Sequence, residues 1–230
     1  MKIIAIIPAR GGSKGLKMKN VRELRGNPLI VRPIKHALKS NFIDKVYVTT
    51  DNETIQKIAI KAGAHCPFLR PSTLAESFTT TEETLKYALN EAEEYFSMRF
   101  DLSVFLTATD IYREVSWIDE CIETIKQDDK IESVFIGYKT TKNYWEFDNN
   151  KWTRLKNWMK IYGSRQTRRS VVREDTGVCC VSRSNLWREG KRIGDNVRII
   201  VKDTPFNGFD IHNEFDLFLA EKALEYYGKD

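Results

Sequence analysis

The chain opens on Ile3-Ile4-Ala5-Ile6-Ile7-Pro8-Ala9-Arg10-Gly11-Gly12-Ser13-Lys14-Gly15. Its first six residues form a continuous apolar run, which is typical of a strand buried on both faces of a parallel sheet. The three glycines that follow let the backbone pass close to a ligand, so that free N–H groups can face phosphate oxygens. A solvated surface turn would have a similar composition, but this loop directly follows a buried first strand. We therefore expect a phosphate-binding loop here.

The loop differs from the two common phosphate-binding sequences. It contains neither the G-x-G-x-x-G pattern of dinucleotide sites nor the G-x-x-x-x-G-K-[ST] pattern of P-loops. Arg10, Lys14 and Lys19 add positive charge to it. The sequence thus predicts a polyphosphate site of another class.

Strands and helices alternate along most of the chain. Apolar runs predict strands at 3–8, 44–49, 102–106, 133–138, 176–181 and 197–201. Helical periodicity predicts helices at 28–40, 52–62, 80–95, 116–127 and 213–227. This order is typical of an α/β fold with a mostly parallel sheet and helices on both faces. We expect a single domain over residues 1–230, with ligands bound beyond the carboxyl ends of the strands.

One segment, 139–162, breaks this alternation. It has no clean helical period, and among its lysines and asparagines stand Tyr144, Trp145, Phe147, Trp152, Trp158 and Tyr162. We interpret it as a strand-rich excursion from the sheet. Aromatic side chains outside a core often mark a protein–protein contact.

Composition narrows the class of protein. Of the 230 residues, 41% are hydrophobic and 30% charged, an ordinary globular composition without an 18-residue apolar run. The apolar N-terminal run is too short for a signal peptide, and the four cysteines form no C-x-x-C pair, so we expect a cytoplasmic protein without disulfides or zinc. The net charge of +5 suits small polyanions better than nucleic acid, and we expect neither nucleic acid nor membrane as a partner.

The stretch 6–15, continuing through Lys19-Asn20, resembles the N-terminal signature of the acylneuraminate cytidylyltransferases. This family makes CMP-sialic acids and related CMP-nonulosonates, and the CMP-Kdo synthetases are its cousins. Further matching stretches follow in order, so that the resemblance covers nearly the whole chain: Pro28-Leu29-Ile30, Val48-Thr49-Thr50-Asp51, Arg70-Pro71, Glu174-Asp175-Thr176-Gly177 and Phe209-Asp210-Ile211.

The resemblance implies a Rossmann-like nucleotidyltransferase that transfers CMP from CTP to an acidic sugar and releases pyrophosphate, with Mg²⁺ as cofactor. It also implies a homodimer formed through the excursion 139–162, which would reach towards the acceptor pocket of the other subunit. The implied catalytic residues are Arg10, Lys14, Lys19 and Asp210. The implied nucleotide contacts are Ala9, Arg10, Gly11, Gly12, Ser13, Lys14, Lys19, Asp51 and Arg70. The implied acceptor contacts are Thr107, Thr109, Asp110, Arg113, Arg165 and Gln166, of which the last two would face the acceptor carboxylate.

The loop 107–113 departs from the family pattern. The family usually has Gln-Pro-Thr-Ser-Pro-x-Arg there, whereas this chain has Thr107-Ala108-Thr109-Asp110-Ile111-Tyr112-Arg113. Because this loop helps shape the acceptor pocket, a nonulosonic acid and another acidic acceptor, such as a Kdo-like acid, another sugar acid or a phosphonate, both stay open. A non-catalytic nucleotide-binding module is the third alternative.

A second departure concerns the metal. The usual Asp-x-Asp is Asp210-Ile211-His212 here, and imidazole is a poor magnesium ligand. Asp110 follows a predicted strand, near the place where the Kdo-type cousins carry an acidic metal ligand. Our hypothesis is that Asp110 and Asp210 hold the metal together. The alternatives are that Asp110 recognises the acceptor or caps the next helix.

Overall fold

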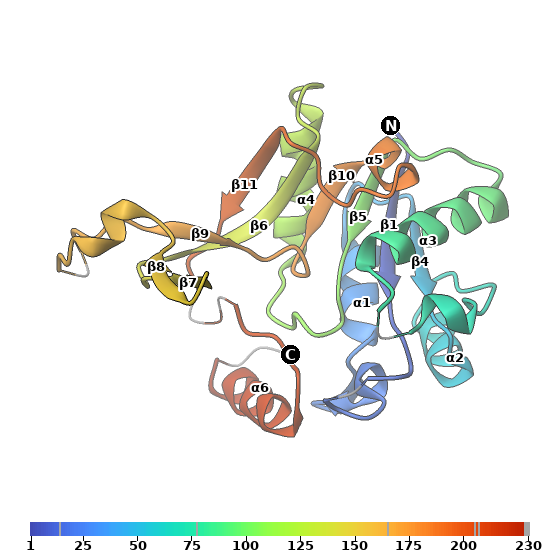
Figure 1. Cartoon of the computed structure of the whole chain (residues 1–230). Helices are drawn as coiled ribbons and strands as arrows, with labels where there is room; N and C mark the ends of the chain where they lie inside the picture. The colour runs from blue at the N-terminus through green and yellow to red at the C-terminus, as the bar shows by residue number, and fades with distance from the viewer. Residues whose placement is uncertain (14, 77, 165, 205, 207, 228–230) are drawn as a thin grey trace.

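The fold is built on one seven-stranded sheet (Figure 1), seen in a computed structural model that describes residues 1–13, 15–76, 78–164, 166–204, 206 and 208–227. The strand order is β11-β6-β10-β5-β1-β4, and β9 pairs with β6 outside this path. The strands are β1 (Ile3–Pro8), β4 (Lys45–Thr49), β5 (Leu102–Phe105), β6 (Ser133–Thr140), β9 (Val171–Glu174), β10 (Cys180–Arg183) and β11 (Val197–Val201).

Five of the seven strands run in the same direction. β1 lies between β4 and β5 and runs parallel to both, and β11 runs parallel to β6. The exceptions are β10, which is antiparallel to β5 and β6, and β9, which is antiparallel to β6. The predicted mostly parallel α/β fold is confirmed. The strand predicted at 176–181 is corrected: residues 176–178 form a turn, and β10 begins at Cys180.

Helices cover both faces of the sheet (Figure 1). They are α1 (Val31–Lys39), α2 (Glu53–Lys61), α3 (Thr81–Phe96), α4 (Val115–Lys126), α5 (Ser184–Arg188) and α6 (Glu214–Tyr227). Successive side chains of β1 point to opposite faces. Ile7 therefore packs in the larger core with α1, α2 and α4, while Ile6 packs in the smaller core with α3 and α5.

Two helices begin at the carboxyl edge of the sheet with well-formed caps. The Asn52 side chain accepts hydrogen bonds from the N–H groups of Thr54 (3.0 Å) and Ile55 (3.1 Å) at the start of α2. Thr80 forms a capping box with Glu83 at the start of α3. These caps fix where the loops that precede both helices must run, and those loops border the site described below.

A short ribbon separates β1 from α1. It consists of the 3₁₀ turn η1 (Lys19–Val21) and the paired strands β2 (Glu23–Leu24) and β3 (Asn27–Pro28). The helix predicted from residue 28 begins later because Pro28 pairs with Glu23. α6 packs against this ribbon, where Arg22 forms an ion pair with Glu214 (2.8 Å).

The excursion projects away from the sheet at the left of Figure 1. It contains the hairpin of β7 (Trp145–Asp148) and β8 (Lys151–Arg154), followed by the 3₁₀ turn η3 (Asn157–Lys160). Asn149 and Asn150 take the positive φ angles of the hairpin turn. The predicted strand-rich excursion is thus confirmed in its structure. Among the described helices, none combines the length and apolar composition that a membrane span requires.

Candidate functional site

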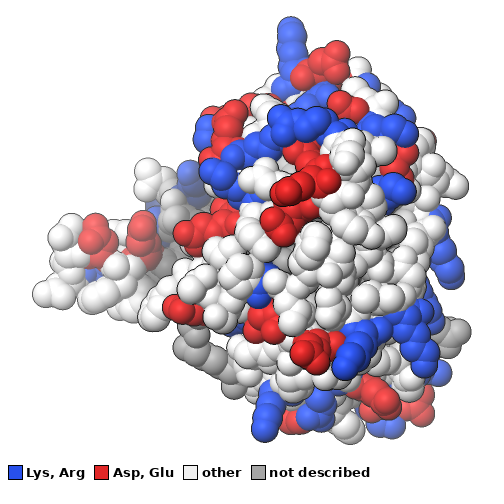
Figure 2. Space-filling view, turned by 90° about the vertical axis from the view of Figure 1, so that its right-hand side faces the viewer, with Lys and Arg blue, Asp and Glu red and all other residues white. Residues whose placement is uncertain are grey.

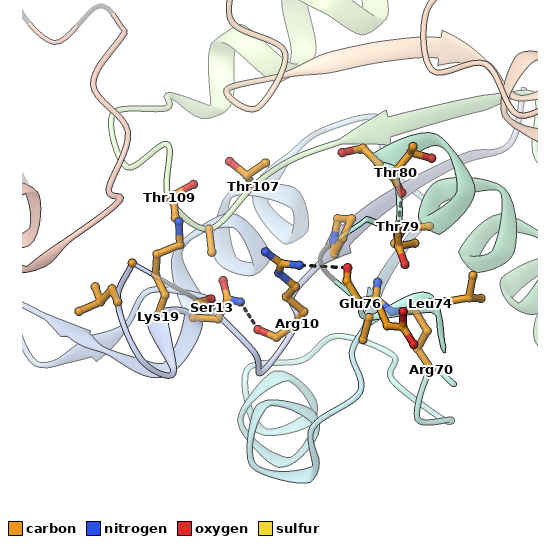
Figure 3. Close-up of a pocket in the computed structure, with 18 of the residues that line it drawn as sticks. Arg10, Ser13, Lys19, Arg70, Leu74, Glu76, Thr79, Thr80, Thr107 and Thr109 are labelled. Atoms are coloured by element: carbon orange, nitrogen blue, oxygen red, sulfur yellow. Dashed lines mark hydrogen bonds between the residues drawn. The ribbon is translucent and has the colours of Figure 1, made fainter. Parts of the chain in front are cut away.

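A cleft of about 540 Å³ opens at the carboxyl edge of β1 and β5 (Figure 3). Its walls come from the loop after β1, from residues 70–84, which include the 3₁₀ turn η2 (Ser72–Leu74), and from the loop after β5. A second cavity of about 340 Å³ adjoins it. The two share the lining residues Thr81, Phe105, Thr107, Thr109 and His212, so that they form one continuous site.

The loop after β1 is held in shape by three contacts. The Gly11 N–H donates to Asp51 Oδ1 (2.9 Å), and Asn20 Nδ2 donates to the carbonyl oxygen of Arg10 (2.9 Å). The Arg10 guanidinium crosses the cleft and donates to the carbonyl oxygen of Glu76 (3.2 Å; Figure 3). Arg10 and Ser13 therefore face the cleft, whereas Asp51 supports the loop from behind.

The same loop is joined to the segment 210–212. A β-carbon built on Gly15 would lie 2.5 Å from the carbonyl oxygen of His212, so only glycine fits there without a backbone shift. Lys19 Nζ donates to the carbonyl oxygen of Ile211 (2.8 Å). Burial lowers the pKa of Lys19, while the nearby charges of Asp210 and Asp110 oppose this shift. Lys19 thus places its ammonium group beside both carboxylates.

Asp110 is buried at the second cavity. It accepts a short hydrogen bond from Thr107 Oγ1, and the missing side chain of Gly177 leaves room for its carboxylate. Burial, followed by the charge of Asp210, raises the pKa of Asp110 to about 7. Two carboxylates with this mutual repulsion are costly to keep ionised unless a cation compensates them.

Asp210 lines the same cavity as Asp110. Its Oδ2 is 3.3 Å from His212 Nε2, while its buried Oδ1 accepts no hydrogen bond from any described residue. Asp175 lines the same cavity, and burial raises its pKa against the opposing charge of Arg173. Among the described residues, no group of three or more His, Cys, Asp or Glu side chains is arranged to hold a metal ion.

Arg70 is buried at the wall of the larger cleft. Its backbone N–H donates to the carbonyl oxygen of Thr50 (2.7 Å), which fixes it next to the end of β4. Burial lowers the pKa of Arg70, and Asp51 opposes this effect. Its Nε and one terminal nitrogen have no hydrogen-bond acceptor among the described residues. A buried donor without an acceptor is costly, so this edge of the guanidinium is suited to a ligand.

Arg113, which the sequence analysis predicted as an acceptor contact, lies outside both cavities. Its guanidinium is buried beneath the loop and donates to the carbonyl oxygens of Thr107 (2.9 Å), Gly177 (2.7 Å) and Val178. It lines neither cavity of the site, and burial lowers its pKa to about 10. Arg113 therefore holds the loop that carries Asp110. Its guanidinium binds backbone carbonyl oxygens, whereas the sequence analysis expected it to bind the acceptor.

The structure brings eight of the sixteen predicted site residues together. Those that line one or both cavities are Arg10, Ser13, Lys19, Arg70, Thr107, Thr109, Asp110 and Asp210. The side chain of Ala9 packs in the core. Gly11 and Gly12 belong to the loop after β1, and Asp51, which follows β4, supports that loop; none of the three lines a cavity. Gln166 is exposed between η3 and β9 and lines neither cavity. Lys14 and Arg165 lie outside the described residues.

Sequence reasoning missed several lining residues. Thr79, Thr80 and Thr81 border the cleft at the start of α3, and Arg173 and Arg192 line the second cavity. The T-x-x-E capping pattern, together with the rule that sites lie at the carboxyl edge, contained the signal for the threonines. No comparable pattern marks Arg192, which follows the five-residue helix α5.

Charge on the surface is mixed. On the face shown in Figure 2, basic and acidic side chains are interspersed, and no single-sign patch covers that face. The positive charge is instead concentrated in the sequence from the start of the excursion to the end of β9: residues 139–174 contain ten Lys or Arg and three Asp or Glu.

Comparison with known proteins gives a consistent result. A family model described as Cytidylyltransferase matches residues 4–185. The chain is 30% identical to the post-translational flagellin modification protein B of Campylobacter coli, over 97% of this chain and 95% of that protein. It is 28% identical to a CMP-N,N'-diacetyllegionaminic acid synthase of Campylobacter jejuni, over 96% and 94% of the two chains.

A third relative is longer than this chain. The N-acylneuraminate cytidylyltransferase of Escherichia coli is 35% identical over 66% of this chain, which spans only 38% of that enzyme. Among solved structures, a CMP:2-keto-3-deoxy-manno-octonic acid synthetase complexed with CTP superposes with a TM-score of 0.73. The alignment covers 99% of this chain and 100% of that one at 12% identity, which demonstrates a shared fold.

Proposed function

The chain belongs to the cytidylyltransferase family, and from this premise we propose that it transfers CMP from CTP to a nonulosonic-type sugar acid. A hydroxyl oxygen of the acid forms the new bond to the α-phosphorus. The bond from that phosphorus to the pyrophosphate oxygen breaks, and the hydroxyl proton is released. The observation that carries this proposal is the continuous cleft in which Arg10 and Lys19 lie beside Asp110 and Asp210.

The nucleotide occupies the larger cleft in this proposal. Arg10 and Lys19 provide fixed positive charge for the triphosphate and for the pyrophosphate that leaves, where negative charge grows during the reaction. The unpaired guanidinium edge of Arg70 donates to the oxygen and nitrogen acceptors of a pyrimidine ring. The phosphates are held at the loop after β1, so the buried guanidinium of Arg70 contacts the base.

The residues present fit a magnesium ion. Magnesium prefers hard oxygen ligands, commonly one or two carboxylates, and completes its shell with phosphate oxygens and water. Asp210 has a buried oxygen that accepts no hydrogen bond from the described residues, and Asp110 is buried nearby. When bound, the ion would supply positive charge at the phosphate oxygens. Asp110 and Asp210 would hold the ion. In this arrangement Asp110 provides the second carboxylate, which His212 cannot provide.

Asp110→Asn tests this assignment. We expect the variant to require a higher magnesium concentration for half-maximal activity, because one of two carboxylate ligands is lost. The matched control is Asp175→Asn, since Asp175 lines the same cavity but forms an ion pair with Arg173 (3.1 Å). An unchanged magnesium requirement in Asp110→Asn would leave acceptor recognition as the role of Asp110.

Pyrophosphate release tests the reaction itself. The full chain would be assayed with each of the four nucleoside triphosphates, combined with pseudaminic acid, N,N'-diacetyllegionaminic acid, N-acetylneuraminic acid or Kdo. We expect release with CTP and one or more of the nonulosonic acids. Stabilisation of the protein by CTP without turnover of any acid would contradict the proposal.

A Kdo-like acid is the second candidate acceptor. Two observations favour testing it: the loop 107–113 differs from the sialic-acid pattern, and the fold superposes on a CMP:2-keto-3-deoxy-manno-octonic acid synthetase. Turnover of Kdo alone would select this candidate over a nonulosonic acid. Because such enzymes use cellular CTP, we propose the cytoplasm as the place of action.

We further propose a homodimer formed through the excursion. Its hairpin exposes Trp145, Phe147 and Trp152, the last with 63% of its surface accessible. Arg154 stacks over the Trp145 ring at 4.2 Å and donates to Tyr162 Oη (3.1 Å), which makes this aromatic surface locally rigid. A rigid exposed aromatic patch is well suited to association with a second copy.

Light scattering coupled to size exclusion tests the dimer at micromolar concentration. We expect the mass of two chains for the wild type and of one chain for the variant Phe147→Ser, Trp152→Ser. The control is Tyr226→Ser, another exposed aromatic residue, on α6. A monomeric wild type would refute the dimer.

A further inference from the structure

Arg192 is fixed by its backbone at the edge of the second cavity. Its carbonyl oxygen accepts hydrogen bonds from Ser182 Oγ (2.7 Å) and from Trp187 Nε1 (3.0 Å). Both donors are buried, Ser182 in β10 and Trp187 in α5. The position from which the Arg192 side chain projects is therefore determined by the core and does not depend on a mobile loop.

The Arg192 side chain extends between two acids. Nε lies 3.5 Å from Glu82 Oε1, and a terminal nitrogen donates to Glu174 Oε1 (3.3 Å). The guanidinium lies 5.7 Å from the centre of the Phe105 ring. Its buried Nε–H has no hydrogen-bond acceptor of suitable geometry among the described residues. The group is thus held in place while part of its donor capacity is unused.

Arg192 and the two carboxylates Asp110 and Asp210 line the same cavity. Among the described residues of that cavity, the other arginine is Arg173, whose charge is engaged by Asp175 (3.1 Å) and by the Tyr138 ring (4.6 Å). An acceptor whose reacting hydroxyl lies near Asp110 and Asp210 has the rest of its skeleton in this cavity. Arg192 and Glu174 are then available to its substituents.

On the basis of the proposed function, we propose that Arg192 and Glu174 form a specificity-determining subsite for the acceptor. The subsite binds a substituent away from the reacting hydroxyl that both accepts and donates hydrogen bonds. The guanidinium donates to an oxygen of the substituent, and the Glu174 carboxylate accepts from its N–H or O–H. Both an acylamino group and a pair of neighbouring hydroxyls have this chemistry.

Polar subsites of this kind discriminate strongly. When the acceptor lacks the substituent, the buried Nε–H of Arg192 stays without an acceptor. Such an acceptor is therefore rejected more strongly than one that lacks only an apolar contact. The subsite therefore adds selectivity among sugar acids without touching the reacting atoms. Its effect should appear in the KM of the acceptor and leave the KM of CTP unchanged.

The test uses steady-state kinetics of the full chain with CTP and each of three acids: N,N'-diacetyllegionaminic acid, N-acetylneuraminic acid and Kdo. The variants are Arg192→Gln and Arg192→Lys, and the control is Glu82→Gln. Glu82 forms an ion pair with Arg192 but does not line the cavity. Thermal unfolding without ligands is measured for all variants. If Arg192 only connected α3 to β9, its replacement would lower the stability of the protein.

We expect Arg192→Gln to raise the KM of the best acid about tenfold, with the KM of CTP and kcat changed less than about twofold. Arg192→Lys should recover part of the loss, because a point charge replaces only some of the guanidinium geometry. Glu82→Gln should leave the acceptor KM nearly unchanged. A larger loss with the diacetylated acid than with Kdo identifies an amide as the substituent, whereas equal losses identify hydroxyls.

Three results would overturn the proposal: an unchanged acceptor KM in Arg192→Gln, an equal rise in the KM of CTP, or equal effects of Arg192→Gln and Glu82→Gln together with lowered stability. If the wild type turns over no acid, the proposed function fails first. Saturation-transfer NMR of the three acids with CTP present then decides whether Arg192→Gln weakens acceptor binding. Absence of binding to the wild type would refute both proposals.

Discussion

Gly15 and His212 are in such close backbone contact that a side chain on Gly15 would meet the His212 carbonyl oxygen at 2.5 Å. The hydrogen bond from Lys19 to Ile211 (2.8 Å) lies next to this contact. The loop after the first strand and the segment that carries Asp210 are therefore joined, although they come from opposite ends of the chain. Any group bound by the loop is placed at a fixed position relative to the Asp210 carboxylate.

Gly15→Ala should disrupt this junction. Because the new β-carbon meets backbone atoms, the segment 210–212 must shift, and we expect a loss of stability of about 1–3 kcal/mol, as for other overpacked sites. We also expect kcat/KM to fall at least about tenfold, since a displaced Asp210 no longer faces the cleft correctly. Thermal unfolding without ligands and pyrophosphate-release kinetics measure the two effects.

Gly12→Ala is the matched control for the unfolding measurement. A β-carbon on Gly12 has nothing within 4 Å, so the protein without ligands should keep its melting temperature. Equal melting temperatures for Gly15→Ala and Gly12→Ala would show that the junction is not rigid.

The sequence predicted the elements that depend on local pattern. The apolar run of β1 has the predicted limits, because burial on both faces demands unbroken apolar residues. The edge strand β11 also has the predicted limits, although three of its five residues are exposed. Contacts between distant segments were not predictable in this way. The start of β10 moved to Cys180 because residues 176–178 form the turn whose carbonyls Arg113 binds.

The same limit applies to the site. Arg10 and Lys19 follow from a loop pattern that resembles a known family, and both face the cleft. Residue type alone does not distinguish whether Arg113 and Arg192 are surface cations or bind a substrate. Only the three-dimensional packing shows that the first is buried under a loop and that the second lines a cavity.

Arg113→Met tests the corrected role of Arg113. The variant leaves the carbonyl groups of Thr107, Gly177 and Val178 without their shared donor, so we expect a loss of about 3 kcal/mol or more in the free energy of unfolding. Chemical denaturation measures this loss. Arg113→Lys should restore part of it, because one ammonium group still reaches some of the carbonyls. A fully stable Arg113→Met with only a raised acceptor KM would return Arg113 to the substrate contacts.

Arg188→Met should destabilise the fold without affecting the site. Arg188 forms two hydrogen bonds with the buried carboxylate of Glu93, which also accepts from the Phe100 N–H (2.9 Å). Removing the arginine leaves Glu93 buried with less compensation, and the expected cost is about 3 kcal/mol. Urea denaturation measures it, and the KM of CTP should not change.

Arg99→Met is the control for this pair. Arg99 also contacts Glu93 (2.9 Å), but 76% of its side-chain surface is exposed, so its loss should cost less than about 1 kcal/mol. Similar costs for Arg99→Met and Arg188→Met would mean that burial does not control the strength of these ion pairs.

His36 should make the stability of the protein depend on pH. Burial, with smaller effects from Arg113 and Arg32, lowers its pKa to about 3 in the folded chain. The unfolded chain takes up this proton near pH 6.5, so between about pH 6.5 and 3 the unfolded state binds more protons and stability falls as the pH falls. At pH 5 the contribution amounts to about 2 kcal/mol by proton linkage.

Urea denaturation of the wild type and of His36→Gln at pH 5 and pH 8 isolates the contribution of His36, because the carboxylates titrate in both proteins. The stability difference should shift by that amount in favour of the variant at pH 5, and parallel pH profiles would show that His36 becomes protonated in the folded protein.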